Sequence, residues 1–379
     1  MKLRTVLFGL VGVVVLAAVG FGGWIASLPP SVAAAPSPVP AAETAAIIEA
    51  LRPPKRERPV VAVIGLNDAT ETTDYLMPTG ILRRADVADV YLVAPEDGPV
   101  QLYPALQVEP DTTIAAFDTA QPAGADYVIV PAMSRDDDPA VIQWLNAQAA
   151  KGSIVIGVCA GAKVVAAAGL LEGRRGTTHW FYKRDLARIA PSVTQVADRR
   201  FVVDGAVATT TGISASIPLA LTLVEAIAGP DKADAVAATI GIPQWDARHD
   251  SAAFGLSRDF VTTIMGNSLA FWQRETVGIA MQPGFDAVSL ALAADAWSRT
   301  YKSAAFTTAS APQAVADFTG IRVIPDHVDS AAPGGLAIEL HDAAPGPALD
   351  DTLRAIGQRY GEATAHVVAM QLEYPRSPI

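Results

Sequence analysis

A strand-like run passes directly into a helix-forming segment where SIVIGVC, residues 153–159, is followed by AGAKVVAAAGLL. Earlier apolar runs of strand length alternate in the same way with segments of helical pattern. Strands are expected at residues 60–66, 90–94, 127–130 and 153–159, and helices at residues 73–84 and 139–151. This alternation predicts an α/β fold, a parallel sheet sandwiched by helices. Because ligands bind beyond the carboxyl ends of the strands in such sheets, Cys159 lies where chemistry is expected.

The single cysteine stands in the sequence Gly157-Val158-Cys159-Ala160-Gly161, with small residues on both sides. A sharp strand-to-helix turn needs such residues, because a nucleophile there adopts a strained backbone that neighbouring side chains would obstruct. A thiol at a helix N-terminus is favoured as the thiolate, and free N–H groups, notably that of Ala160, can hold an oxyanion. The alternative is a buried structural cysteine, since free cysteine is among the most buried residue types. The glycine spacing favours a nucleophile elbow.

The overall composition excludes several other kinds of site. The chain of 379 residues has a net charge of −11 and no basic stretch interleaved with aromatic residues, so nucleic acid is not an expected partner. One cysteine allows no intramolecular disulfide, and the five histidines lack the spacing of a zinc site. We therefore predict no metal ion and no cofactor, and we expect a small molecule as substrate or ligand.

Residues 1–30 carry the pattern of a transmembrane signal-anchor. Lys2 and Arg4 precede an uncharged run from Thr5 to about Leu28, roughly the 20 apolar residues that a helix needs to cross a bilayer. These positive charges predict a cytoplasmic N-terminus and a single-pass membrane protein whose body lies outside the cytoplasm. A cleaved signal peptide is the alternative, although its apolar core is usually about 7–15 residues long. Residues 31–58, rich in proline and alanine, are expected to form a linker.

Two later stretches carry a family resemblance. They are GVCAGAKVVAAAGLLEGRRGTTHW, from position 157, and DRRFVVDGAVATTTGISASIPLALTLVEAIAG, from position 198. Residues 59–230 resemble the ThiJ/PfpI family of the class I glutamine amidotransferase-like superfamily, most closely the domains that precede AraC-type DNA-binding modules. The resemblance implies a flavodoxin-like sandwich, often dimeric, with Cys159 in the position of the nucleophile. The family's histidine falls on His179, and its acidic residue falls on Asp74, which LMPTGILRRA follows.

The resemblance leaves some assignments open. Glu71 and Asp68 are close enough to Asp74 to be confused with it, and Asp74 has the alternative role of a charge at a helix N-terminus. The family has Pro-Gly-Gly after the third strand, where this chain has Pro131-Ala132-Met133, so one oxyanion N–H would come from the methionine. The late family motif Gly-Ile-Asp reads Ser216-Ile217-Pro218 here, and its acidic group is missing. These departures weaken the expectation of amidase-like turnover.

Residues 231–379 are expected to form a second, degenerate and incomplete α/β unit of the same kind. A weak internal repeat matches positions 215 residues apart. The matched pairs are Ile64 with Ile279, Arg84 with Arg299, Ala94 with Ala309, Val100 with Val315, Val108 with Val323, Pro110 with Pro325 and Asp111 with Asp326. The second copy has no cysteine, and Ser289 stands at the position of Asp74. We expect residues 276–345 to pack on the first domain as an intramolecular pseudo-dimer partner that covers the site and leaves the body monomeric.

The leading functional hypothesis is a cysteine-dependent hydrolase, hydratase or glyoxalase-like enzyme that acts on a small electrophile. Cys159 would attack carbon, Asp74 would hold and tune the thiol, and His179 would move protons. The N–H groups of Ala160 and Met133 would stabilise an oxyanion. We predict a thiol that is partly ionised at pH 7. Replacement of Asp74 with Asn is expected to raise the thiol pKa or to block stable oxidation of the thiol, without unfolding the protein. The competing hypothesis is a non-catalytic regulatory module that senses a ligand or a redox change.

Overall fold

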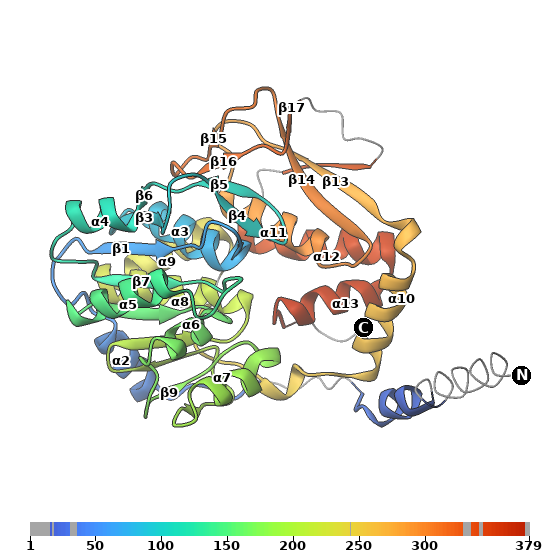
Figure 1. The fold of residues 1–379 in the computed structure, drawn as a ribbon, viewed down its shortest axis with the longest axis horizontal. Helices are drawn as coiled ribbons and strands as arrows, with labels where there is room; N and C mark the ends of the chain where they lie inside the picture. Colours follow the sequence, from blue (N-terminus) through green and yellow to red (C-terminus); the bar gives the residue numbers. More distant parts are fainter. Residues whose placement is uncertain are drawn as a thin grey trace, which may run out of the picture.

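A sheet of seven strands forms the centre of the first half of the chain (Figure 1). The computed structural model describes residue 16 and residues 19–30, 36–242, 244–328, 335–340 and 344–375. In spatial order the strands are β11 (Phe201–Asp204), β12 (Val207–Thr210), β8 (Ile154–Gly157), β7 (Tyr127–Val130), β1 (Val60–Ile64), β3 (Asp89–Ala94) and β6 (Thr112–Thr113). Neighbouring strands run parallel, except that β11 and β12 are antiparallel. The predicted parallel α/β sheet is confirmed.

Helices cover both faces of this sheet. They are α2 (Ala41–Ala50), α3 (Thr72–Ala85), α4 (Ile114–Ala120), α5 (Pro139–Ala150), α6 (Gly161–Ala167), α7 (Lys183–Ile189), α8 (Ser216–Ala228) and α9 (Pro230–Ile240). Strand β1 is buried along its length, with Val61 and Val63 packed on the side of α3 and α8 and its other residues on the side of α5 and α6. This two-sided burial explains its uninterrupted apolar sequence. The four predicted strands and two predicted helices begin and end within two residues of the observed ones.

The second half builds a smaller parallel sheet with its own helices. In spatial order its strands are β17 (His327–Val328), β14 (Ser303–Ala309), β13 (Glu275–Ala280) and β18 (Leu336–Glu339). Its helices are α10 (Arg258–Leu269), α11 (Ala287–Ser298), α12 (Pro345–Tyr360) and α13 (Glu362–Gln371). Figure 1 shows α11 and α12 beneath the β13–β14 pair and α13 beside α10. The apolar faces of β13, α11 and α12 join the same buried cluster as α3 and α8, so the two halves share one core.

Two contacts hold the halves together. Helix α3 packs against α11 so closely that a Cβ placed on Gly80 would lie 2.5 Å from Cγ2 of Val288. The second contact is a five-stranded sheet to which both halves contribute. In spatial order its strands are β15 (Val315–Ala316), β16 (Arg322–Ile324), β5 (Gln107–Glu109), β4 (Val100–Tyr103) and β2 (Thr70–Glu71). The first contact joins α3 to α11, and the second joins β5 of the first half to β16 of the second.

The pairing across this interface follows the offset of the internal repeat. Val108 lies opposite Val323, which is its own equivalent, since 108 plus 215 is 323. The pairing of Val100 with Val108 recurs as the pairing of Val315 with Val323. A two-fold axis between equivalent units pairs an element with its own equivalent in antiparallel register, as observed here.

Two ion pairs repeat the same relation. Arg299 pairs with Glu71 at 2.7 Å, and Arg84 pairs with Asp286. Adding 215 to 84 and to 71 gives 299 and 286, so each pair is the counterpart of the other. Glu71 caps the N-terminus of α3, and Asp286 caps the N-terminus of α11. The two helices therefore exchange equivalent charges across the interface.

The prediction of an N-terminal transmembrane anchor is not supported by the structure. Among the residues that the structure describes, no helix is long and apolar enough to cross a membrane. On this finding the predictions of a single-pass membrane protein, of a membrane partner and of a body outside the cytoplasm are wrong. Residues 1–15, 17 and 18 of the predicted anchor lie outside the described residues. In the described part of that segment, Arg258 donates a hydrogen bond to the Ala26 carbonyl at 2.8 Å.

Candidate active site

Cys159 lies at the carboxyl end of β8, where the chain turns sharply before α6. Its φ is 55°, in the left-handed region that residues with a Cβ rarely adopt. The Cys159 N–H donates to Oγ1 of Thr210 at 2.9 Å, and Oγ1 of Thr178 donates to the Cys159 carbonyl at 2.9 Å. These two bonds hold the strained residue on both sides. The conformation is that of a nucleophile elbow.

The two glycines of the motif are required by close backbone contacts. A Cβ on Gly161 would lie 1.9 Å from the carbonyl oxygen of Val130 in β7. A Cβ on Gly157 would lie 2.9 Å from the backbone of Ala162 in α6. No side chain larger than hydrogen fits at Gly161 without moving the neighbouring strand. The glycines thus allow the strand and the helix to approach each other at the elbow.

Cys159 borders a cavity of about 480 Å³ that both halves of the chain line. Ala160, Met133 and His179 also border it, on the side of the first half. Six aromatic side chains make up much of its wall: Tyr103, Trp180, Phe181, Tyr182, Phe260 and Tyr301. Phe260 and Tyr301 come from the second half. Such a wall suits a small molecule that carries an apolar group.

The three acidic residues considered for the site lie in different surroundings. Asp68 is exposed and pairs with Arg135, away from the cavity. Glu71 lines the cavity, and its Oε2 accepts the Asp74 N–H at 2.6 Å. Asp74 is fully buried, and its Oδ2 accepts the Ala132 N–H at 3.1 Å. Its Oδ1 has no hydrogen-bond partner within the described ranges. Asp74 thus holds the loop of Met133 in place and keeps one oxygen unbound.

Burial dominates the protonation of these groups. It raises the pKa of Asp74 well above its ordinary value, and the neighbouring charge of Glu71 raises it further. Burial and the charge of Asp295 raise the pKa of Glu71 to about 8. Burial therefore favours the neutral form of Asp74, whereas Arg299 lowers the pKa of Glu71 and forms an ion pair with it.

Burial also controls the protonation of the Cys159 thiol. The prediction that this thiol is partly ionised at pH 7 is wrong. Burial raises the pKa of Cys159 well above its ordinary value, and the charges of Asp74 and then Glu71 add to the effect. A hydrogen bond from the Ala160 N–H to the sulfur acts in the opposite direction and is outweighed. The expectation from the helix N-terminus omitted this burial. The thiol is protonated at pH 7.

His179 lies in the cavity wall with both ring nitrogens engaged. Its Nδ1 accepts the Phe181 N–H at 3.2 Å, and Nε2 lies 3.1 Å from the Gln371 carbonyl. Because Nδ1 accepts and a carbonyl can only accept, the proton is on Nε2. Burial lowers the pKa of His179, which keeps the ring neutral. In this arrangement the imidazole ties the Trp180–Tyr182 segment to the C-terminal segment.

Two backbone N–H groups remain for an oxyanion. Met133 faces Thr70 in an antiparallel bridge whose hydrogen bonds come from the neighbouring residues. These bonds run from the Glu71 N–H to the Ala132 carbonyl at 2.8 Å and from the Ser134 N–H to the Ala69 carbonyl at 3.0 Å. The Met133 N–H is thus not used by the bridge, and the Ala160 N–H bonds only the sulfur in the described part of the chain.

Two charged residues of the site were not predicted. Arg299 donates to Glu71 and to Asp295 at 2.7 Å each and borders the cavity. Its place in the 215-residue repeat, opposite Arg84, is the signal that points to it.

Glu373 is the other, and no sequence pattern marks it. Its Oε2 accepts the N–H groups of Gly212 and Trp180 at 2.5 and 3.3 Å, and its Oε1 lies 2.9 Å from Nε2 of His249. This carboxylate lies beside the late motif whose own acid is missing. Within the described residues, no group of three or more His, Cys, Asp or Glu side chains is placed to hold a metal ion.

Comparison with known proteins places this site in a family. The model of the DJ-1/PfpI family matches residues 60–226. Isonitrile hydratase of Pseudomonas putida is 36% identical over 167 residues, which cover 43% of this chain and 70% of that protein. The Parkinson disease protein 7 homolog of Danio rerio is 27% identical over 184 residues, 47% of this chain and 95% of that protein.

A regulator and a solved structure also match. The HTH-type transcriptional regulator CdhR of Pseudomonas aeruginosa is 31% identical over 134 residues, 34% of this chain and 40% of that protein. The crystal structure of a mutant DJ-1 superfamily protein from Salmonella typhimurium is 28% identical and covers 49% of this chain and 100% of its own, with a TM-score of 0.43. The chain belongs to the DJ-1/PfpI family.

Proposed function

We propose that this protein is a cysteine-dependent hydratase that adds water to a small electrophilic carbon bearing an apolar group. One observation carries the proposal: the Cys159 thiol borders an aromatic-walled cavity, and behind it lies the fully buried Asp74, whose Oδ1 has no hydrogen-bond partner among the described residues. A thiol with a neutral acid nearby suits an uncharged substrate that must gain a proton as sulfur bonds to carbon. The similarity to isonitrile hydratase supports an isonitrile as the first substrate class to test.

The reaction balances with the groups present. The Cys159 sulfur bonds to the terminal carbon of an isonitrile, R–N≡C. A proton from Asp74 goes to that carbon, and the thiol proton returns to Asp74, which leaves the thioimidate R–N=CH–S. Water adds to the same carbon and a proton goes to nitrogen. The hydroxyl proton of this adduct then moves to sulfur as the carbon–sulfur bond breaks, which releases the formamide R–NH–CHO and restores the thiol.

The other groups have supporting roles. The N–H groups of Ala160 and Met133 would bind the hydroxyl oxygen of the water adduct, which gains negative charge as it loses its proton and the carbon–sulfur bond breaks. His179 would position the Trp180–Tyr182 wall instead of moving protons, because both its nitrogens bond to backbone groups. The aromatic wall would hold the apolar group of the substrate and exclude bulk water.

The second half would act as a built-in second subunit. Five of its residues line the cavity: Phe260, Ile264, Arg299, Tyr301 and Gln371. The reciprocal ion pairs and the pairing of Val108 with Val323 support a two-fold relation between residues 59–230 and residues 231–379. We expect one chain to contain a complete site.

The test is hydration of cyclohexyl isonitrile by the full chain, with the formamide product measured by mass spectrometry. We expect turnover by the native protein, none by Cys159→Ser, and a loss of about 100-fold or more with Asp74→Asn, which cannot supply the proton. The control is Asp68→Asn, which changes an exposed acid outside the cavity and should retain full activity. Absence of product from the native protein, or equal product from Cys159→Ser, would contradict the proposal.

The bonding of His179 favours a second candidate, a ligand-binding regulatory module without turnover. A neutral histidine with both nitrogens bonded and a protonated thiol are compatible with simple binding. The similarity to a transcriptional regulator agrees with it. A regulatory module would bind the isonitrile and return it unchanged, so the same product measurement separates the two functions.

A further inference from the structure

A second, smaller cavity lies between the two halves, separate from the site of Cys159. This rear cavity has a volume of about 250 Å³. Its wall is mainly apolar and comes from both halves, with Ile217 of α8 in the first half and Leu292 and Leu349 of α11 and α12 in the second. Ile213 borders both the rear cavity and the cavity of Cys159.

One cationic side chain, Arg200, borders this apolar cavity. Its Nε donates to the Arg248 carbonyl at 2.8 Å. In the part of the chain that the structure describes, its two terminal nitrogens form no hydrogen bond, and no carboxylate forms an ion pair with it. Arg200 is half-buried, and the partial loss of water lowers its pKa. A guanidinium whose terminal nitrogens are not hydrogen-bonded can bind an anion.

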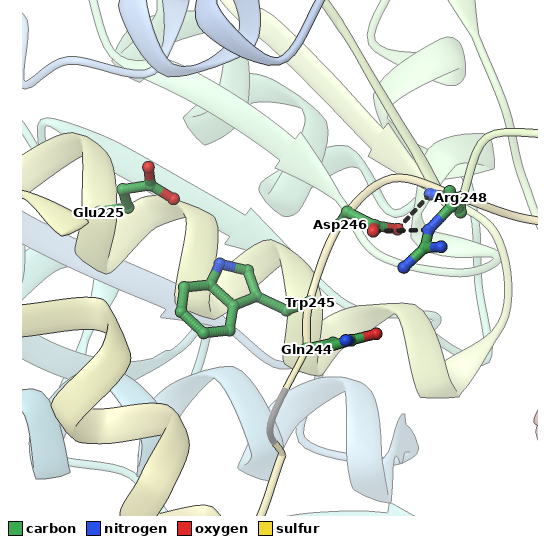
Figure 2. Close-up of a pocket in the computed structure, with 5 residues that line it drawn as sticks. All are labelled: Glu225, Gln244, Trp245, Asp246 and Arg248. Atoms are coloured by element: carbon green, nitrogen blue, oxygen red, sulfur yellow. Dashed lines mark hydrogen bonds and ion pairs between the residues drawn. The ribbon is translucent and has the colours of Figure 1, made fainter. Parts of the chain in front are cut away.

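The acidic groups near Arg200 are each engaged by another donor. Asp246 accepts two hydrogen bonds from Arg248, from its N–H at 2.9 Å and its Nε at 2.6 Å, which Figure 2 shows as dashed lines. Glu373 accepts the N–H groups of Gly212 and Trp180 and contacts His249. The Tyr374 hydroxyl donates to Asp350 at 2.9 Å. None of these groups supplies the direct partner that the Arg200 terminal nitrogens lack.

The indole of Trp245 lies between the rear cavity and a second pocket. Gln244 and Trp245 border both the rear cavity and an outer pocket of about 380 Å³ whose other residues include Glu225. Figure 2 shows the Trp245 ring in this outer pocket, beside Glu225 of α8. Because the chain has six tryptophans, the Trp245 signal is the difference in fluorescence between the native protein and Trp245→Phe.

We propose that the rear cavity binds a small monocarboxylate with a short alkyl chain, whose carboxylate pairs with Arg200. The apolar wall selects the chain, and the guanidinium selects a planar anionic head group. The cavity of about 250 Å³ has room for a short alkyl chain beside the carboxylate, and hexanoate is the probe that we choose.

The experiment is a titration of the full chain with hexanoate, followed by Trp245 fluorescence and by calorimetry. We expect saturable binding of hexanoate and at least tenfold weaker binding of hexanamide, which has the same shape without the charge. Arg200→Met should abolish this preference for the carboxylate. The matched control is Arg188→Met, which removes an exposed arginine paired with Asp185 and should bind as the native protein does.

Two further measurements exclude misfolding of the Arg200 variant and binding at the cavity of Cys159 as explanations. The preference for hexanoate over hexanamide is measured on the native protein, so it needs no variant. Hexanoate should also leave the rate of Cys159 alkylation unchanged within twofold, because its cavity is separate. Equal binding of acid and amide, binding that persists in Arg200→Met, absence of saturable binding, or strong protection of Cys159 would each overturn the proposal.

Discussion

Helices α3 and α11 occupy equivalent places in the two halves, and they differ in what surrounds them. Each begins at an acidic N-cap, Glu71 or Asp286, which pairs with an arginine of the opposite half. Helix α3 contains Asp74, which acts on the strained Cys159, whereas α11 has Ser289 at the equivalent position and the second half has no cysteine. The second half thus keeps the interface and lacks the chemistry. We infer that the function of the second half is its contact with the first half.

The largest effect should come from the elbow, which has no equivalent in the second half. Gly161→Ala places a Cβ 1.9 Å from the Val130 carbonyl oxygen, so we expect a loss of about 4 kcal/mol or more in the free energy of unfolding. Gly255→Ala, in the second half, meets no atom within 4 Å and should change it by less than about 0.5 kcal/mol. Urea unfolding measures both. Similar losses for the two variants would show that the elbow is not tightly packed.

The next comparison is between the two equivalent arginines. Arg299→Met leaves Glu71 and Asp295 buried without their partner, and we expect a loss of about 3–5 kcal/mol. Arg84→Met breaks the counterpart pair, where Asp286 is more exposed, and should cost about 1 kcal/mol. Urea unfolding at pH 7 distinguishes them. Equal losses would contradict the expectation that the more buried ion pair of Arg299 contributes more to stability than that of Arg84.

The pH dependence of the thiol tests the chemical side of the comparison. At the high pH where Cys159 ionises, Asp74 is ionised as well, and its charge opposes formation of the thiolate. Asp74→Asn removes that charge and keeps an oxygen for the Ala132 N–H, so the thiol pKa should fall, opposite to the expectation from the sequence. Each unit of fall raises the thiolate fraction tenfold below the pKa. Iodoacetamide alkylation rates from pH 7 to 10 should shift to lower pH, and a shift to higher pH would restore the earlier expectation.

The smallest effect is expected at the position equivalent to Asp74. Ser289 is buried, and its hydroxyl has no hydrogen-bond partner in the described ranges. Ser289→Ala removes a hydroxyl that pays a desolvation cost, so the free energy of unfolding should stay the same or rise by up to about 1 kcal/mol. Thermal and urea unfolding would detect this change. A loss above 1 kcal/mol would reveal a function for this hydroxyl.

The first half was more predictable than the second because its signals are local. Strand runs, helix starts and the glycines around Cys159 depend on neighbouring residues, and their predicted positions agree with the observed ones to within two residues. The thiol pKa and the bonding of His179 depend on groups distant in sequence, such as Gln371, which 192 residues separate from that histidine. Such long-range burial leaves no local pattern. Only the 215-residue repeat indicated the two-fold pairing between the two halves of the chain.

Arg299 is a site residue that the sequence could have revealed. Its match to Arg84 in the repeat, together with the acid three residues before Asp74, was enough to suggest reciprocal ion pairs between two equivalent helices. Glu373 had no such signal, because its role depends on the path of the C-terminal segment across the late motif. Repeats therefore carry interface information that single motifs lack.

A disulfide between positions 108 and 323 tests most directly whether the second half is a built-in partner. Directly opposed residues of antiparallel strands have Cα atoms about 4.5–5.5 Å apart, which a disulfide can span. In a Cys159→Ser background, Val108→Cys with Val323→Cys should form a bond within one chain, so non-reducing mass analysis gives a monomer at every concentration. Disulfide-linked dimers as the main product, increasing with concentration, would contradict the account.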